Sequence, residues 1–165
     1  MDTSQEDYEV IEADLDRAQH QSDVRALTAA YAVDPMGNDG VLPADVLDRL
    51  IPGLRAHPTT IVFLAYSRGR AVGLATCFRG FSTFAALPII NISDLAVLPE
   101  YRGRGLGRSL LAAVEKKARA LGCCKLTLEV QENNRLARRT YERGGFSQAI
   151  YGPTTGGSLY YWKAL

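Results

Sequence analysis

One stretch of this chain constrains its fold more than any other: the run from Asn91 to Arg108, NISDLAVLPEYRGRGLGR. It begins as an apolar strand, Pro99 then ends the strand, and a glycine-rich basic turn follows. From there to Leu121 the apolar residues recur at helical spacing, which predicts a long amphipathic helix. A turn that exposes backbone N–H groups at the start of a helix binds anions, most often phosphate. The run therefore predicts a strand, an anion-binding turn and a helix in succession.

The turn combines three alternating glycines, at positions 103, 105 and 107, with arginines at positions 102, 104 and 108. Glycine has no Cβ, so a ligand or another backbone can come close to it. The spacing matches neither the dinucleotide fingerprint G-x-G-x-x-G nor the P-loop pattern G-x-x-x-x-G-K-[ST]. A tight turn with close packing of helix on strand would also use these glycines, but the arginines favour a phosphate ligand.

Periodicity along the rest of the chain predicts further strands and helices. The expected strands are 8–13, 60–66, 71–79, 89–98, 125–130, 146–151 and 158–164. The expected helices are 19–33 with Ser22 or Asp23 as cap, 43–57, 105–121, and 133–143. Residues 1–7 are polar and are expected to be disordered. Antiparallel hairpins thus precede a strand–helix–strand–helix unit, which is an α/β (α+β) arrangement in one domain.

Composition limits the possible partners. The chain has 165 residues, 47% of them hydrophobic, which suits one domain with a sizeable core. Its net charge is +1, so nothing global indicates nucleic acid. Residues 1–60 hold twelve acidic and four basic residues (net −8), and residues 61–165 hold six acidic and fifteen basic ones (net +9). This asymmetry indicates either a basic ligand site in one half or two solvated faces that attract each other.

The three cysteines, Cys77, Cys123 and Cys124, do not suggest a disulfide framework, because their number is odd and two are adjacent. Neighbours on a strand point to opposite faces, so the adjacent pair is also a poor metal site, and no metal is expected. We interpret all three as small buried residues in a reducing compartment. The N-terminus resembles no signal segment, and no apolar run is long enough to cross a membrane. These features predict a soluble, cytoplasmic protein with no membrane partner.

Two runs resemble a known family. The run DLAVLPEYRGRGLGRSLL resembles the acyl-CoA-binding motif of the GNAT superfamily of N-acetyltransferases. In that motif a strand and a proline precede the turn Arg/Gln-x-x-Gly-x-Gly/Ala. The second run, LEVQENNRLARRTYERGGF, resembles the strand and helix that come next in the family, with Asn134, Ala137, Tyr141, Gly145 and Phe146 in register. Together the runs cover about a third of the chain.

The resemblance implies a fold and a cosubstrate. The implied fold is a mixed, mostly antiparallel central sheet of six to seven strands with about four flanking helices. Its strands are splayed apart between 89–98 and 125–130, so that a thioester can lie in the slot. The whole chain, 1–165, would form a single acyl-CoA N-acyltransferase domain. Acetyl-CoA (coenzyme A) would be the cosubstrate, without a metal.

The resemblance also implies where coenzyme A binds. Its diphosphate would lie on the backbone N–H groups of the turn, with the arginine side chains at the rim. Its pantetheine arm would run beside the preceding strand, which carries a bulge in the family, and bind the backbone as a strand edge does. The implied coenzyme contacts are Leu95, Ala96, Val97, Arg102, Gly103, Arg104, Gly105, Leu106, Gly107, Arg108, Asn134 and Tyr141. Asn134 would also serve as a helix cap.

Acetyl transfer to an amine by direct attack needs a base for the amine, donors for the oxyanion, and a proton for the departing thiolate. By resemblance, Tyr141 lies near the coenzyme sulfur and is the candidate acid. Some family members use a glutamate at the position of Glu129 as the base, acting through water, while Asp94, next to the implied bulge, is its rival. The backbone of Val97 is the implied oxyanion donor. Ordinary strand carboxylates and a half-buried helix tyrosine would give the same pattern.

The acceptor is left open. The family acetylates small-molecule amines as well as peptide and protein amines. Residues 31–45 and 152–158 would choose among them, and the first region holds Asp34, Asp39 and Asp45. Loop aspartates are more often turn formers than ligands. The alternative function is a non-catalytic acyl-CoA-binding or sensing domain, and the presence of Tyr141 argues against it. Whether the chain forms a homodimer is left open.

Overall fold

The structure, a computed structural model, describes residues 8–38, 40–150, 152–154 and 156–165. These residues fall into two compact units, one ending at Gln131 and the other beginning at Glu132. The disorder expected at 1–7 lies outside the described residues. The single domain over 1–165 stays a prediction.

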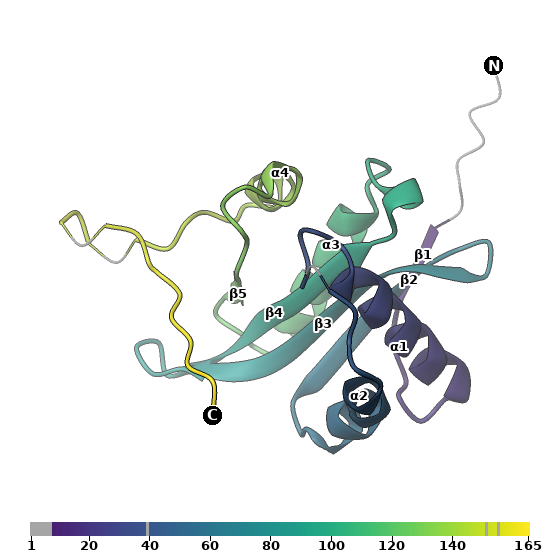
Figure 1. Cartoon of the computed structure of the whole chain (residues 1–165). Coiled ribbons are helices and arrows are strands. Elements are labelled where there is room, and N and C mark those ends of the chain that lie inside the picture. The colour runs from purple at the N-terminus through teal and green to yellow at the C-terminus, as the bar shows by residue number, and fades with distance from the viewer. Residues whose placement is uncertain (1–7, 39, 151, 155) are drawn as a thin grey trace. The chain divides into compact units, whose positions relative to one another are not determined.

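Five strands form one sheet in the first unit, in the order β1-β2-β3-β4-β5 (Figure 1). They are β1 Tyr8–Glu12, β2 Thr60–Ser67, β3 Arg70–Ser82, β4 Leu87–Val97 and β5 Leu126–Leu128. The first three pairings are antiparallel, and β4 pairs with β5 in parallel. The mixed, mostly antiparallel sheet is therefore confirmed, with five strands in place of the six to seven expected.

The two remaining strands were expected at the end of the chain, at 146–151 and 158–164. Among the described residues of the second unit, the β-structure is limited to an isolated antiparallel bridge between Ile150 and Gly157. Apolar side chains such as Tyr161 and Trp162 are exposed there. Alternating polarity predicts a strand, but it does not show whether a partner strand lies beside the segment.

The described residues contain four α-helices: α1 Ala18–Ala32, α2 Ala44–Ala56, α3 Leu106–Ala120 and α4 Arg135–Arg143. A short 3-10 helix, η1 Pro99–Tyr101, follows β4. The predicted cap of α1 at Ser22 or Asp23 is wrong, because the helix begins after Arg17 without a side-chain cap. Asp23 instead lies inside the helix and accepts a hydrogen bond from the Tyr66 hydroxyl at 2.6 Å.

Helices cover both faces of the sheet, α1 and α2 on one face and α3 on the other (Figure 1). Buried apolar residues of α1, α2, β2 and β3 form the first layer of the core: Val24, Leu27, Ile51, Leu54, Val62, Leu64 and Leu74. On the opposite face lie buried residues of α3, namely Leu106, Leu110, Leu111, Val114 and Ala118. Successive strand residues point to opposite faces of the sheet, and helices cover both faces. For that reason β2 is apolar almost throughout.

The sheet splits between β4 and β5. The two strands pair over only three residues each, and the last pair joins Ile92 to Leu128. Directly beyond it, Cys77 pairs with Ile92 and Thr76 with Asp94, so Ser93 is an extra residue in β4. Such a bulge bends its strand and disrupts pairing. The splay predicted between 89–98 and 125–130 is therefore confirmed, and it opens toward the carboxyl ends of both strands.

The cysteines differ in exposure. Cys77 is buried in β3, as expected, but Cys123 is only partly covered and Cys124 is exposed. The adjacent pair lies in the segment between α3 and β5, because β5 begins only at Leu126. The prediction that all three are buried is therefore wrong for this pair.

Candidate active site

The glycine-rich turn joins β4 to α3. Gly103 and Gly105 have φ angles of +77° and +88°, a region that favours glycine. A Cβ added to either residue would meet nothing within 4 Å, so their outer surface is open to a ligand. Gly105 also stands at the N-cap of α3, where no side chain caps the helix.

Backbone donors converge on this open surface. Within the described chain, the N–H groups of Gly103, Gly105, Leu106, Gly107 and Arg108 donate to no protein acceptor. A helix N-terminus carries a partial positive charge of about half an elementary charge, which adds to the attraction of these donors for an anion. The turn thus offers N–H donors that an anion could use, and the diphosphate site stays a prediction.

The arginines of the turn have three different environments. Arg104 donates from Nη2 to the Glu100 carbonyl at 2.9 Å and lies over the Tyr101 ring, 5.5 Å from its centroid. Arg108 is exposed and forms no ion pair within the described chain. Arg108 is therefore the guanidinium of the turn that is most available to a ligand.

Arg102 turns away from the rim. Its Nε donates to the Val97 carbonyl at 2.9 Å, and its Nη2 donates to the Asp34 carboxylate at 2.5 Å. The Asp34 side chain is only 11% exposed. The hydrogen bond from Arg102, together with one from the Met36 N–H, holds the pKa of Asp34 below its ordinary value. Arg102 was expected at the diphosphate rim, and its coenzyme role stays a prediction.

Beyond the bulge, no strand among the described residues pairs with the edge of β4 that faces the split. The Leu98 N–H donates to the Val72 carbonyl of β3 at 2.9 Å. Antiparallel partners alternate between bonded and non-bonded pairs, so the N–H and carbonyl of Val97 point the other way, into the split. Leu95 shares this orientation, and Ala96 between them faces β3. An edge without a partner strand among the described residues therefore lies where the pantetheine arm is predicted, and the Val97 carbonyl there is held by Arg102. The coenzyme contacts of Leu95, Ala96 and Val97 stay predictions.

Asp94 lies on the face of the sheet covered by α1. It pairs with Thr76, which pairs in turn with Val62 of the apolar cluster. Burial raises the pKa of Asp94, and a hydrogen bond from the Thr76 hydroxyl opposes that shift. Tyr31, near the end of α1, faces the same carboxylate. Its pKa is raised by burial and then by the charges of Asp94 and Asp34.

Glu129, the other candidate base, follows β5 directly. Its strand was expected to run to 130, but pairing ends at Leu128 because the bulge in β4 turns that strand away. Glu129 is exposed and forms no ion pair within the described residues. Asp94 on β4 and Glu129 just after β5 thus flank the split, Asp94 largely covered and Glu129 exposed.

Asn134 and Tyr141 belong to the second unit. The Asn134 side chain caps α4 by accepting a hydrogen bond from the Ala137 N–H at 3.1 Å, as predicted. Tyr141 is buried, and its ring centroid lies 6.0 Å from that of Phe146. The coenzyme and acid roles of these two residues stay predictions.

Sequence reasoning did not identify Thr76 or Gln131 as part of this region, and it included Tyr31 only as the first residue of the acceptor range 31–45. Thr76 carried a usable signal, because a single polar residue inside an apolar strand is often bonded to another buried polar group. Tyr31 gave no signal of its own, since its spacing with Val24 and Leu27 suggested only a core position. Of the loop aspartates, Asp34 is paired with Arg102 and Asp45 with Arg49, and Asp39 lies outside the described residues.

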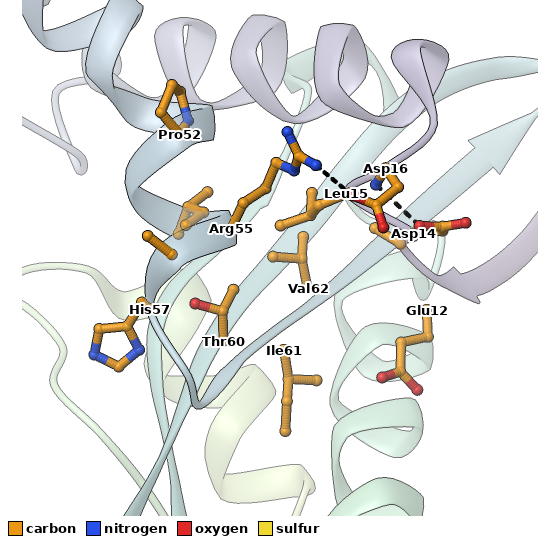
Figure 2. Close-up of a pocket in the computed structure, with 13 residues that line it drawn as sticks. Glu12, Asp14, Leu15, Asp16, Pro52, Arg55, His57, Thr60, Ile61 and Val62 are labelled. Atoms are coloured by element: carbon orange, nitrogen blue, oxygen red, sulfur yellow. Dashed lines mark hydrogen bonds and ion pairs between the residues drawn. The ribbon is translucent and has the colours of Figure 1, made fainter.

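A hollow of about 620 Å³ lies elsewhere, between the end of β1, the last turns of α2 and the start of β2. Figure 2 shows Arg55 reaching across it to Asp16, and the two side chains form an ion pair at 2.6 Å. None of the residues predicted for catalysis or coenzyme binding lines this hollow. Its size therefore does not make it the candidate active site.

Comparison with known proteins agrees with the predicted family. The model of the family described as "Acetyltransferase (GNAT) family" matches residues 24–146. The "Uncharacterized N-acetyltransferase YhfO" of Bacillus subtilis (strain 168) is 32% identical over 89 residues, 54% of this chain and 60% of that protein. The "N-alpha-acetyltransferase MAK3" of Arabidopsis thaliana is 35% identical over 91 residues, 54% of this chain and 46% of that protein. The chain thus spans about half the length of these relatives.

Solved structures share the fold. The aminoglycoside N-acetyltransferase AAC(6')-Iy, solved in complex with CoA, superposes with a TM-score of 0.74 at 18% identity over the full length of both chains. Within the described residues of this chain, no helix has the length and apolar character needed to cross a membrane. The same residues contain no group of three or more His, Cys, Asp or Glu side chains arranged to hold a metal.

Proposed function

This chain belongs to the acetyltransferase (GNAT) family, and we propose that it transfers an acetyl group from acetyl-CoA to a primary amine by direct attack in a ternary complex. The observation that carries this proposal is the open turn at 103–108, where the N–H groups of Gly105, Leu106, Gly107 and Arg108 at the start of α3 donate to no acceptor within the described part of the chain. It stands directly beside the split between β4 and β5. An anion site next to an unpaired strand edge suits a molecule with a diphosphate at one end and an amide-bearing arm at the other.

The donor half of the proposal uses the backbone. The diphosphate accepts hydrogen bonds from the turn, with Arg108 beside it. The pantetheine amides pair with the free edge of β4 at Leu95–Val97, as an added strand would. The thioester carbonyl oxygen then accepts a hydrogen bond from the Val97 N–H, which stabilises the oxyanion of the tetrahedral intermediate.

The chemical step balances without a covalent enzyme intermediate. The neutral amine nitrogen attacks the thioester carbonyl carbon, and a C–N bond forms. The C–S bond then breaks, the thiolate takes a proton from the Tyr141 hydroxyl, and the amine's surplus proton passes to a carboxylate directly or through water. The products are an N-acetylated amine and coenzyme A.

Asp94 is the carboxylate that the site favours as base, with Glu129 and a water chain as rivals. Because burial raises the pKa of Asp94, it is a stronger proton acceptor than a fully solvated aspartate. It lies on β4 one residue before the edge that would hold the thioester. Glu129 is exposed, so its advantage would be access to water.

The acceptor classes follow from the relatives' names. An N-alpha-acetyltransferase points to peptide or protein N-termini, and an aminoglycoside N-acetyltransferase points to small polyamines of that class. A turnover screen with acetyl-CoA should therefore include peptide amines, lysine side chains, polyamines and aminoglycosides. Release of the coenzyme thiol, together with the mass of the product, measures the reaction.

The outcomes separate the proposed enzyme from its alternative. Turnover with any amine supports the enzyme. Binding of coenzyme A without turnover on any amine supports the non-catalytic acyl-CoA-binding domain. If coenzyme A gives no protection against heat denaturation, neither function holds.

A further inference from the structure

The loop after α1 is held at two points by residues that lie next to the candidate site. We define residues 34–38 as the strap. Its first residue, Asp34, binds Arg102 of the glycine-rich turn. Near its end, the Gly37 carbonyl accepts a hydrogen bond from Nε2 of Gln131 at 3.2 Å. Both anchors lie within the first unit.

The two anchors stand on opposite sides of the split in the sheet. Arg102 follows β4 by five residues, and Gln131 follows β5 by three. Because β4 and β5 are parallel, their carboxyl ends lie at the same end of the sheet. The strap therefore spans the open end of the split, from the turn on one side to the continuation of β5 on the other.

The strap has a defined internal structure. Asp34 accepts the Met36 N–H on Oδ1 at 2.8 Å, which leaves Oδ2 for Arg102. The Gly37 N–H donates to the Asp34 carbonyl, also at 2.8 Å. A Cβ on Gly37 would lie 2.1 Å from the Tyr31 carbonyl oxygen, so only glycine fits there without a backbone shift. One carboxylate thus both shapes the strap and ties it to the turn.

Arg102 is the partner of Asp34 on the glycine-rich turn. It belongs to the turn proposed to hold the diphosphate, yet it binds the Val97 carbonyl and Asp34. It lines a small cavity of about 20 Å³ together with Tyr31 and Val97. An arginine can hold two acceptors at once through its planar fork, which a lysine cannot reproduce.

We propose that Asp34 and Arg102 are positioning residues that couple the glycine-rich turn to the strap. When coenzyme A binds the turn, this coupling orders the strap over the face of the sheet where Asp94 and Tyr31 lie and where the amine would bind. Neither residue touches the reacting atoms. The inference rests on the proposed function for the amine, but the coupling itself concerns only coenzyme A and the strap. Coupling of this kind is reciprocal: the ordered strap also strengthens coenzyme binding.

Hydrogen exchange tests the coupling without any acceptor. In the wild-type protein, coenzyme A should slow exchange in peptides covering the strap. Asp34→Asn should speed exchange there about tenfold and abolish the response to coenzyme A, because opening becomes easier when the ion pair is lost. Arg102→Lys should act on the strap in the same way. The matched control is Asp45→Asn, which breaks the exposed Asp45–Arg49 pair of α2 and should leave the strap unchanged.

Steady-state kinetics tests the consequence for the amine. Asp34→Asn should raise KM for the amine about tenfold while kcat changes less than about twofold, as expected when binding is lost without loss of transition-state contacts. Gly37→Ala disturbs the strap without changing any charge and should reproduce this pattern. Equal strap exchange in the Asp34→Asn and Asp45→Asn variants, or strap exchange in the wild type that coenzyme A does not slow, would overturn the coupling. If the wild type turns over no amine, the proposed function fails and the exchange experiment still decides the coupling.

Discussion

Placing a glutamate at Gly105 tests the diphosphate site most directly. The φ angle of +88° costs a non-glycine residue about 1–2 kcal/mol. No clash adds to that cost, because nothing lies within 4 Å of the added Cβ. The carboxylate would enter the space proposed for the diphosphate. Two unit charges about 4 Å apart repel by roughly 1 kcal/mol in water and about 4 kcal/mol at a protein surface. Coenzyme affinity should therefore fall between about 5-fold and 1000-fold.

The chain offers a matched control at the other end of α3. Gly122 has a φ angle of +69°, and a Cβ there would also meet nothing within 4 Å. Gly122→Glu should therefore lose a similar stability, about 1–2 kcal/mol, which corresponds to a few degrees in Tm for a chain of this size. It should leave coenzyme binding unchanged, because it lies at the opposite helix terminus.

Thermal denaturation with and without acetyl-CoA separates the two effects. A ligand present at about 100 times its Kd stabilises a protein by about 2.7 kcal/mol. Both variants should melt lower than the parent without ligand, and only Gly105→Glu should lose the protection that the ligand gives. Equal protection of the two variants would show that the diphosphate does not bind at this turn.

Further predictions concern the acid, the base and the core. Tyr141→Phe should lower kcat about 10- to 100-fold with little change in coenzyme affinity, because it removes the proton for the thiolate; an unchanged kcat at saturating substrates would remove Tyr141 from the mechanism. If Asp94 is the base, Asp94→Asn should abolish the increase of kcat with pH, and Glu129→Gln should leave that increase unchanged. The reverse result would make Glu129 the base. Since the pKa of Asp94 is raised in the folded state, its ionisation opposes folding as pH rises from about 4 through that raised value. Urea titrations should therefore show that the free energy of unfolding of Asp94→Asn rises relative to that of the parent as pH increases across that window. Above the window the difference should stay constant. A difference that grows on acidification would contradict the assignment. Tyr66→Phe should lower the free energy of unfolding by about 1–2 kcal/mol, because it removes the donor to Asp23; a smaller loss, equal to that of Tyr101→Phe, would show that the bond adds nothing.

Much of the donor side could be predicted from the sequence, because local patterns determine it. The helical spacing of Leu106, Leu110 and Val114 and the glycines before them were sufficient to predict α3 and its exposed N-terminal turn. The splay between β4 and β5 was implied by the family resemblance, and the position of Ser93 as the extra residue gives its physical cause. The final strands were predicted wrongly, because a pattern of polarity does not reveal whether a partner strand is present.

The two contacts that anchor the strap could not be predicted, because they join residues far apart in the chain. Asp34 and Arg102 are 68 positions apart, and Gly37 and Gln131 are 94 positions apart. Each residue alone has an ordinary role: a loop aspartate, one of three basic residues in a turn, a glycine, and a polar residue after a strand. Only the parallel course of β4 and β5 brings the two pairs to one end of the sheet.

The charge asymmetry of the sequence has a mixed physical origin. Among the described residues, two ion pairs join the acidic first sixty residues to the basic remainder: Asp34 with Arg102, and Glu12 with Lys117. The remaining ion pairs lie within one half or the other. Few of the charged residues therefore form ion pairs between the two halves of the sequence. In the turn, Arg102 is committed to Asp34 while Arg108 has no ion pair in the described chain. Binding of a diphosphate there must therefore depend on the backbone N–H groups and the α3 dipole more than on the number of arginines. For that reason a single change at Gly105 should be more damaging than the loss of any one guanidinium that faces solvent.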